Sequence, residues 1–391
     1  MIEASAVWLV PGAHHPVFAR YARFFSSLFR RFEALDYRAL YLDAGSRGTT
    51  AAIGRAIART KPDLIIYTQF PSSYGYLTPD FINGLRASAR VVALGFDDEI
   101  YFEQSKHFYT RCDAVITTDL DDARRLQELG IAVHIAQMQH PDAPPPVQPA
   151  VEDIAVSFVG DMTKPGRREW VSALEAAGTA VRDYGYGSRN GTIDDGGVID
   201  VFLRSKINLN FTSTNPPAWV LRRHPERGGT HQIKARPFDL AALGKFCLCE
   251  WAPCVDYWFR ADAEIGVFRN ASELVSATRR YLEDENARRR IAAAAHERHR
   301  NEYAPDLQFR RIFTEVLAQP KSANQRALPG TEPLFYESLG RSRAVSFLHA
   351  LRHGRPLRAL HEAIGEDAIR MDYWRGFTGG VSDTVIAQVR R

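Results

Sequence analysis

The stretch HQIKARPFDLAALG, residues 231–244, combines a His, two cations and an acid at the start of a predicted short helix that Gly244 ends. The free N–H groups and the macrodipole of a helix N-terminus favour anions. Lys234 and Arg236 would strengthen such a site for a phosphate or diphosphate, and Asp239 would accept hydrogen bonds from a sugar or ribose hydroxyl. The alternative interpretation of this stretch is an ordinary amphipathic helix with a charged first turn.

Length and composition limit the classes to which the chain can belong. At 391 residues it is too long for one ordinary core, so two domains are expected. The mild net charge of +4 does not indicate a nucleic-acid-binding protein and fits anionic small-molecule ligands. The first residues have no basic leader, no apolar run is long enough to span a bilayer, and only four cysteines occur. We therefore expect a cytoplasmic protein, with peripheral contact to the inner face of the membrane left open.

Short apolar runs alternate strictly with helical patterns, which is typical of parallel sheets covered on both faces. A proline-rich segment interrupts the alternation once, and a helical pattern replaces it after Pro320. The predicted fold class is α/β, with two Rossmann-like doubly wound domains facing a cleft and a helical C-terminal extension. The predicted boundaries are an N-terminal domain at 1–140, a linker at 141–150, a C-terminal domain at 151–320 and the extension at 321–391. Within the first domain we expect a helix from Pro16 to about Leu35 and a strand at Ala39–Leu42.

Two groups of polar residues follow predicted strands of the N-terminal domain, where ligands of open α/β sheets bind. His14 and His15 come after the first strand and would act as a base or contact a diphosphate. Asp97 and Asp98 come after another and would bind hydroxyl groups or supply a base. The alternatives are surface histidines and helix-capping carboxylates.

Three further motifs lie at predicted loops. Gly160 and Arg167 follow the first strand of the C-terminal domain, where a small residue and a cation suit a phosphate. The loop at Gly185 superficially resembles a dinucleotide fingerprint, but its third glycine is one residue late, which favours a plain turn. Asp119-Leu120-Asp121 has an acid-x-acid spacing, but a helix cap is favoured for Asp119. We expect neither a metal nor a cofactor.

Two basic amphipathic regions have two open interpretations. The aromatic helix beginning at Pro16 would pack on the core with a basic outer face, which we favour, or lie on an anionic membrane. The basic helices expected at Ser342–His353 and Leu357–Ile364 leave the same two alternatives.

Residues from roughly 150 to 315 resemble GT-B glycosyltransferases, specifically the group similar to the spore-maturation protein CgeB and its glycosyltransferase family 1/4-like relatives. The resemblance is carried by VSFVG at 156–160 with Arg167, SKINLNF at 205–211, KARPFDLAALGKF at 234–246, and AEIGVF at 263–268 with the helices to about Phe313. The motifs are moderately specific as a set. FDDE at 96–99 and CDAVITT at 112–118 extend the resemblance weakly into the first domain.

The resemblance implies a nucleotide-diphosphate sugar bound by the second domain and a hydroxyl-bearing acceptor bound by the first. The implied donor residues are Gly160, Arg167, His231, Lys234, Arg236 and Asp239, and the implied acceptor-side catalytic residues are His14, His15, Asp97 and Asp98. The family commonly has Glu at the position of Asp239, where the acid holds the ribose. Eight residues earlier the related retaining transferases have a second Glu, whereas this chain has His231.

The sequence therefore predicts a glycosyltransferase that moves a sugar from a nucleotide-diphosphate sugar to an acceptor hydroxyl. It is expected to be metal-independent and retaining, with a role in cell-surface polysaccharide or glycoconjugate synthesis. Two alternatives stay open: a non-catalytic GT-B-like nucleotide- or carbohydrate-binding protein, and a nucleotide-sugar epimerase. The expected partners are the nucleotide sugar and the acceptor, and the oligomeric state is open.

Overall fold

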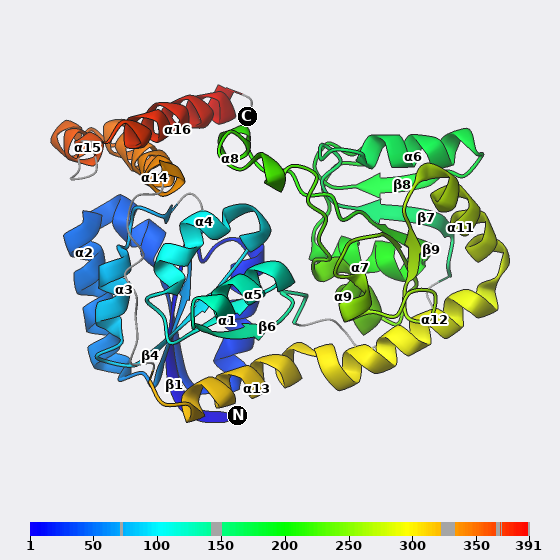
Figure 1. Ribbon diagram of the computed structural model, residues 1–391, viewed down its shortest axis with the longest axis horizontal. Coiled ribbons are helices and arrows are strands. Elements are labelled where there is room, and N and C mark those ends of the chain that lie inside the picture. Colours follow the sequence, from blue (N-terminus) through cyan, green and yellow to red (C-terminus); the bar gives the residue numbers. More distant parts are fainter. Residues whose placement is uncertain (71–72, 142–150, 322–332, 365–367, 369, 390–391) are drawn as a thin grey trace. The chain divides into compact units, whose positions relative to one another are not determined.

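The computed structural model describes residues 1–70, 73–141, 151–321, 333–364, 368 and 370–389. The chain forms two compact units (Figure 1). Unit 1 comprises Met1–Ile135 and Arg310–Arg391, and unit 2 comprises Ala136–Phe309. Except for Pro141, the predicted linker lies outside the described residues.

Unit 1 is built on one parallel six-stranded sheet with helices between successive strands, as the alternation of patterns predicts. The strand order is β2-β1-β3-β4-β5-β6. The strands are β1 (Ile2–Val10), β2 (Phe29–Asp36), β3 (Leu64–Thr68), β4 (Arg90–Leu94), β5 (Ala114–Thr117) and β6 (Ala132–Ile135). The helices are α1 (Pro16–Leu28), α2 (Tyr37–Thr60), α3 (Pro79–Leu85), α4 (Asp98–Tyr109) and α5 (Leu120–Glu128).

The prediction of a helix through Leu35 is wrong, because α1 ends at Leu28 and the next eight residues form the edge strand β2. This strand runs parallel to β1, and its last residue, Asp36, is paired with Val10. The rings of Phe29 and Phe32 stack with their centroids 6.3 Å apart. Pairing with a distant strand thus outweighs the local helical pattern, as tertiary contacts often do.

The strand predicted at Ala39–Leu42 is also wrong, because these residues lie in the first turns of α2. Asp36 caps this helix, with its Oδ1 accepting the backbone N–H of Ala39 at 3.0 Å. Tyr37 and Tyr41 are four residues apart, so both lie on the buried face of the helix. Within the run 39–42 only Tyr41 is buried and Ala39 is exposed, so the four apolar residues do not share one face.

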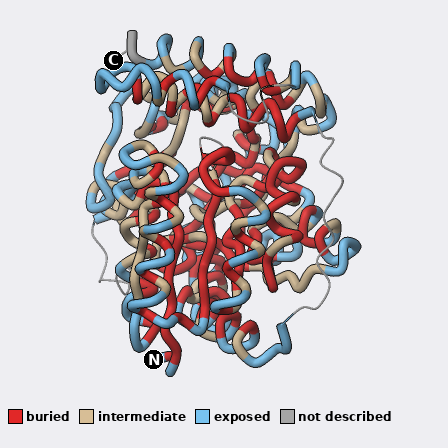
Figure 2. Tube along the Cα trace, turned by 90° about the vertical axis from the view of Figure 1, so that its left-hand side faces the viewer, coloured by how far each residue is buried: buried red, intermediate tan, exposed pale blue. Residues whose placement is uncertain are grey.

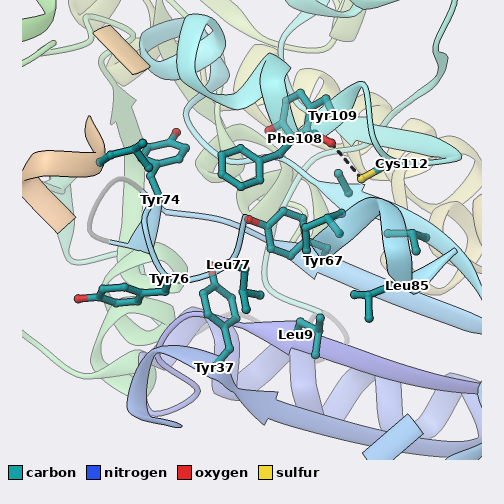
Figure 3. Close-up of a cluster of buried hydrophobic side chains, with 14 of the residues drawn as sticks. Leu9, Tyr37, Tyr67, Tyr74, Tyr76, Leu77, Leu85, Phe108, Tyr109 and Cys112 are labelled. Carbon is teal, nitrogen blue, oxygen red and sulfur yellow. Dashed lines mark hydrogen bonds between the residues drawn. The ribbon is translucent and has the colours of Figure 1, made fainter. Parts of the chain in front are cut away.

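The core of unit 1 is rich in buried tyrosines, which Figure 3 shows around Leu9 and Phe108. Burial raises the pKa of the Tyr37 and Tyr67 hydroxyls, so both stay neutral. The Tyr37 hydroxyl donates to the carbonyl of Thr68 at 3.0 Å. Such pairing makes it possible to bury large aromatic surfaces without leaving polar atoms unsatisfied.

The C-terminal helices confirm the predicted helical extension, and in the structure they belong to unit 1. They are α14 (Pro333–Arg352), α15 (Pro356–Ala363) and α16 (Met371–Val389). The helix α13 (Pro305–Ala318) precedes the predicted extension, beginning in unit 2 and continuing into unit 1 from Arg310. α14 packs against both α15 and α16 and contacts α2 and α4 of the same unit. The hydroxyl of Tyr76, which follows β3, donates to the carbonyl of Ser342 in α14 at 3.3 Å.

Unit 2 repeats the architecture with a parallel five-stranded sheet in the order β11-β10-β9-β7-β8 (Figure 1). The strands are β7 (Ile154–Val159), β8 (Val181–Tyr184), β9 (Ser205–Asn210), β10 (Cys247–Glu250) and β11 (Gly266–Phe268). The helical segments are α6 (Arg167–Ala176), α7 (Asp195–Arg204), α8 (Ala218–Leu221), η2 (Pro225–Arg227), α9 (Ala235–Ala242), α10 (Val255–Trp258), α11 (Ala271–Glu283), α12 (Glu285–Arg298) and η3 (His299–Tyr303). Both sheets confirm the predicted α/β class.

The basic aromatic helix α1 uses its apolar face within unit 1. Phe18, Tyr21, Phe24, Phe25 and Leu28 are all buried. Among the described residues, no helix is both long enough and apolar enough to cross a bilayer.

Candidate functional site

The order of strands in unit 2 places a topological switch point between β7 and β9. The chain leaves β7 toward β8 on one side of the sheet and then returns to place β9 on the other side. In open α/β sheets, ligands bind at the carboxyl ends of the strands where the direction of winding reverses. Gly160 follows β7 and Asn210 ends β9, so both lie at this switch point.

Arg236, in the first turn of α9, reaches the switch point. Its Nη1 donates to Oδ1 of Asn210 at 3.3 Å, and its guanidinium lies 5.5 Å from the centroid of the Phe158 ring. A Cβ added at Gly160 would lie 2.8 Å from the Phe158 ring and 3.1 Å from Nη2 of Arg236. Gly160 is therefore the residue that lets the β7 backbone approach the guanidinium closely.

Arg167, the first residue of α6, is buried at the same place. Its Nη1 donates to the carbonyl of Asp161 at 2.9 Å, and its Nη2 lies 3.4 Å from the carbonyls of Phe211 and Ser213. Its guanidinium is also 5.5 Å from the centroid of the Phe158 ring. The buried Nε has no hydrogen-bond partner in the described parts of the chain. Backbone carbonyls thus hold a cation whose remaining donor is unsatisfied.

The two guanidiniums create a local excess of positive charge. Burial, and then the charge of Arg236, lower the pKa of Arg167 to about 10. Burial likewise lowers the pKa of Arg236. Both groups remain protonated at neutral pH, yet neither forms an ion pair with a carboxylate among the residues that the structure describes. The carboxylates of Asp161, Glu250 and Asp239 act on these charges only from beyond ion-pair distance. Two desolvated like charges so close together are costly, so this arrangement suits an anionic ligand.

His231 is paired with an acid that the sequence analysis missed. Its Nδ1 lies 2.9 Å from Oγ1 of Thr212 and 3.6 Å from Oε1 of Glu250. Glu250 ends β10 and is buried, and its Oε2 accepts the backbone N–H groups of Thr212 and Ser213 at 2.8 and 3.3 Å. The sequence did contain a signal for this pair, because Glu250 directly follows a predicted buried strand and therefore lies at the same edge of the sheet.

Two other predicted donor residues belong to α9. Lys234 is the N-cap residue of this helix, and its side chain makes no cap hydrogen bond. Oδ1 of Asp239 accepts the backbone N–H of His140 at 2.7 Å. Asp239 therefore fastens the segment before unit 2's first strand to α9, and a role with the ribose stays a prediction.

The loop at Gly185 is a turn that supports the switch point. Its φ of +116° is strained for other residues, and an added Cβ would lie 2.3 Å from the carbonyl oxygen of Gly160. The N–H of Gly160 donates to the carbonyl of Tyr184 at 2.7 Å. The loop thus determines the position of the turn after β7.

In unit 1, His14 and His15 lie in the turn after β1. The side chain of His14 is exposed, with its Nδ1 3.9 Å from Oδ2 of Asp36. His15 is the N-cap residue of α1, and its ring centroid lies 5.3 Å from that of Phe18. Partial burial, and then the charges of His14 and Arg20, lower the pKa of His15. His15 is therefore predominantly neutral at pH 7, the state that a base requires.

Asp97 and Asp98 have different surroundings although they are adjacent. Asp97 is the half-buried N-cap residue of α4, in the left-handed conformation with a φ of 53°. Asp98 is buried, and its two oxygens accept hydrogen bonds of 2.6 Å from the hydroxyls of Tyr109 and Thr117. Burial raises the pKa of Asp98 to about 6. Asp98 ties α4 to β5 rather than offering an accessible carboxylate.

The aromatic ring of Phe18 connects the two groups of predicted acceptor residues. Phe96, directly before Asp97, has its ring centroid 5.4 Å from that of Phe18. His15 contacts the same ring. His15 and Asp97 therefore lie at the same edge of the unit 1 sheet.

Asp119 is a helix cap. Its Oδ1 accepts the backbone N–H of Asp122 at 2.8 Å in the first turn of α5. This is the interpretation that the sequence favoured over metal binding.

Residues 164–314 match a family model described as glycosyl transferase-like. This segment is similar to glycosyl transferases. The matched segment includes both arginines at the switch point and all of α9. No curated protein sequence matches this chain.

Solved structures show that the fold of this chain is GT-B. Sucrose-phosphate synthase from Thermosynechococcus elongatus has a TM-score of 0.55 at 12% identity, covering 80% of this chain and 98% of that one. HepE from Anabaena in complex with UDP-glucose has a TM-score of 0.56 at 11% identity, covering 81% and 100%. A glycosyltransferase from Rickettsia africae has a TM-score of 0.53 at 11% identity, covering 82% and 100%.

Proposed function

We propose that this chain is a glycosyltransferase that uses a nucleotide-diphosphate sugar as donor, and that Arg167 and Arg236 bind its diphosphate. The observation that carries the proposal is the pair of guanidiniums, that of Arg167 buried and that of Arg236 half-buried, which form no ion pair with a carboxylate in the described residues. Their place at the switch point of the unit 2 sheet supports it. A further support is HepE, a protein of the same fold whose structure holds UDP-glucose.

The chemical reason is the charge of the leaving group. When the bond between the sugar and the diphosphate breaks, negative charge grows on the phosphate oxygens. Donors that are already in position stabilise that charge without reorganising, and this is commonly the largest catalytic term. Arg167 and Arg236 are held in advance by carbonyl and amide oxygens. We therefore propose a transfer that does not depend on a metal.

Glu250 is proposed as the positioning residue for His231. The single proton of the Thr212 hydroxyl has two acceptors, Oε2 of Glu250 at 3.2 Å and the carbonyl of Trp251 at 3.3 Å. The hydroxyl oxygen is then free to accept from Nδ1–H of His231. This tautomer leaves Nε2 of His231 to act on the donor phosphate or a sugar hydroxyl. A His–Glu pair would thus stand where related retaining enzymes have a single acid.

On the acceptor side, we favour His15 and Asp97 over Asp98 as the catalytic residues that act on the acceptor hydroxyl. His15 is neutral and exposed, and Asp97 is not enclosed as Asp98 is. His14 stays a candidate for orienting the acceptor, and Lys234 and Asp239 stay candidates for the diphosphate and ribose. On the family resemblance, we also propose that the transfer retains the anomeric configuration and that it serves polysaccharide or glycoconjugate synthesis.

A donor screen tests this proposal. Release of nucleoside diphosphate is measured for a panel of nucleotide sugars, with wild type, Arg236→Ala and Arg168→Ala. Arg168 is the matched control because it is the exposed neighbour of Arg167 and donates only to the carbonyl of Gly187 in the described contacts. Loss of one charge-assisted contact costs about 1.5–3 kcal/mol, so Arg236→Ala should lower turnover at limiting donor roughly 10- to 100-fold.

The control variant should turn over like the wild type. If no donor is cleaved by the wild type, or if Arg236→Ala matches Arg168→Ala, the assignment of the diphosphate site is wrong.

A further inference from the structure

Exposed apolar side chains gather in the C-terminal helices. Eight of the fourteen large apolar side chains that are exposed in the described residues lie between 351 and 386. Figure 2 shows exposed residues along the outer side of these helices. Single exposed leucines are ordinary, but a local concentration of this kind marks an interaction surface.

The helix α15 presents its apolar residues in the wrong direction for a core helix. Leu357, Leu360 and Ile364 follow the spacing of one helical face and are 84%, 54% and 60% exposed. The buried face instead carries Ala359 and Ala363. A helix that only packed against unit 1 would be expected to turn the larger side chains inward.

Buried polar contacts prevent α15 from rotating. Glu362 lies on the inner face, where its Oε2 accepts from Nη1 of Arg343 at 2.8 Å and from the Tyr41 hydroxyl at 3.0 Å. Arg358 donates to the backbone carbonyl of Asp43 at 2.6 Å. Turning the leucines inward would bring Glu362 out and break these contacts, so the exposed apolar face is a fixed feature.

The surroundings of this face are basic. Arg352, His353 and Arg355 precede α15 and are exposed. Arg355 also approaches the carboxylate of Asp43, at 3.6 Å. The acid of the helix itself, Glu362, is buried and paired with Arg343. Cations beside a band of leucines match an anionic lipid surface, with headgroups for the charges and acyl chains for the leucines.

We propose that unit 1 docks on an anionic membrane through an α15 face formed by Leu357, Leu360 and Ile364, with Arg352, His353 and Arg355 beside it. This inference does not rest on the proposed donor. The helix would lie in the plane of the interface, as amphipathic helices do, rather than cross the bilayer.

Vesicle sedimentation of the full chain tests the docking. Wild type is mixed with vesicles of phosphatidylcholine alone and with vesicles of equal parts phosphatidylcholine and phosphatidylglycerol. Binding is expected to the anionic vesicles, to be weaker to the neutral ones, and to fall as salt is added. Because the withdrawal of apolar side chains from water drives interfacial binding, Leu357→Gln with Leu360→Gln should weaken binding by at least roughly tenfold.

The matched control is Leu129→Gln, which removes an exposed leucine elsewhere in unit 1 and should bind vesicles like the wild type. The double variant removes two exposed side chains, so its melting temperature should equal that of the wild type. Two results would overturn the proposal: wild type that does not sediment with anionic vesicles, or a double variant that sediments as wild type does. A dimer in solution that the double variant abolishes, without vesicle binding, would assign the face to a second copy and also overturn it.

Discussion

The carboxylate of Glu250 determines, at the scale of single residues, how His231 is presented. Glu250→Gln keeps an oxygen for the N–H of Thr212 but removes the negative charge beside Nδ1. We expect nitrogen NMR of the ring to show Nδ1–H as the main tautomer in wild type and a mixture in the variant. The maximal rate should fall about 10- to 100-fold, with donor affinity little changed, because residues that orient a histidine through its second ring nitrogen commonly act at this magnitude.

Glu264→Gln is the control for losing a buried carboxylate, because Glu264 pairs with Arg260 and Arg298 instead. It is expected to lower stability without changing the tautomer of His231. An unchanged tautomer in Glu250→Gln would disprove the positioning role.

Asp98 gives a prediction about pH and stability. Burial raises its pKa from the ordinary 3.8 to about 6, so between these values the folded state binds a proton more tightly than the unfolded state. Stability then falls as pH rises through that window. Asn cannot ionise. The free energy of unfolding of Asp98→Asn, relative to that of the wild type, should therefore rise by up to about 3 kcal/mol between about pH 4 and pH 7.

Urea unfolding of both proteins at the two pH values measures this difference. The contributions of the other carboxylates cancel in the comparison because both proteins contain them. A difference in unfolding free energy that stays constant with pH would contradict the assignment.

The individual contacts of the site could be predicted only in part. Arg167 begins α6 and Arg236 lies in the first turn of α9, positions that local rules associate with anions. Their convergence on the ring of Phe158 depends on the sheet order, which no local pattern contains. The partner of His231 lies 19 residues away in the sequence at Glu250, so the pair exists only in the folded chain.

At the scale of secondary-structure elements, the turn between β7 and α6 has little room for a side chain at Gly160. Gly160→Ala would place a Cβ against the Phe158 ring and the Arg236 guanidinium. Overpacking of this kind costs about 1–3 kcal/mol, so we expect a lower melting temperature and a weaker affinity for nucleoside diphosphate.

Gly54→Ala in α2 is the matched control, because nothing lies within 4 Å of its added Cβ. It should stabilise the protein by up to about 1 kcal/mol. Thermal melting and calorimetric titration of the two variants measure both effects, and equal behaviour of the two would refute the role of Gly160.

Strands and helices could be predicted where the hydrophobic pattern of the sequence fits only one kind of secondary structure. Strands β7 and β9 are continuous buried runs between helices, and both were expected. The edge strand β2 carries outward charges at Arg30 and Arg31 and was mistaken for the end of α1. An edge strand has only one neighbour and a more polar sequence, so its periodicity is weak.

At the scale of the whole molecule, the repetition of strand and helix was sufficient to predict two doubly wound sheets. The same pattern could not show that the C-terminal helices belong to unit 1. That association depends on contacts such as Arg343 with Glu362 and Tyr76 with Ser342, between residues whose pairing no periodicity indicates. The sequence contains the leucines of α15, but only the folded structure shows that they are exposed.

The central claim is that two guanidiniums of unit 2 bind a diphosphate. Calorimetric titration with a panel of nucleoside diphosphates and the matching monophosphates tests it most directly, on wild type, Arg236→Ala and Arg168→Ala. We predict that wild type and Arg168→Ala bind at least one diphosphate clearly more tightly than its monophosphate. We also predict that Arg236→Ala loses that preference, by roughly 10- to 100-fold in Kd. Equal affinities for diphosphate and monophosphate in the wild type, or an unchanged preference in Arg236→Ala, would contradict the claim.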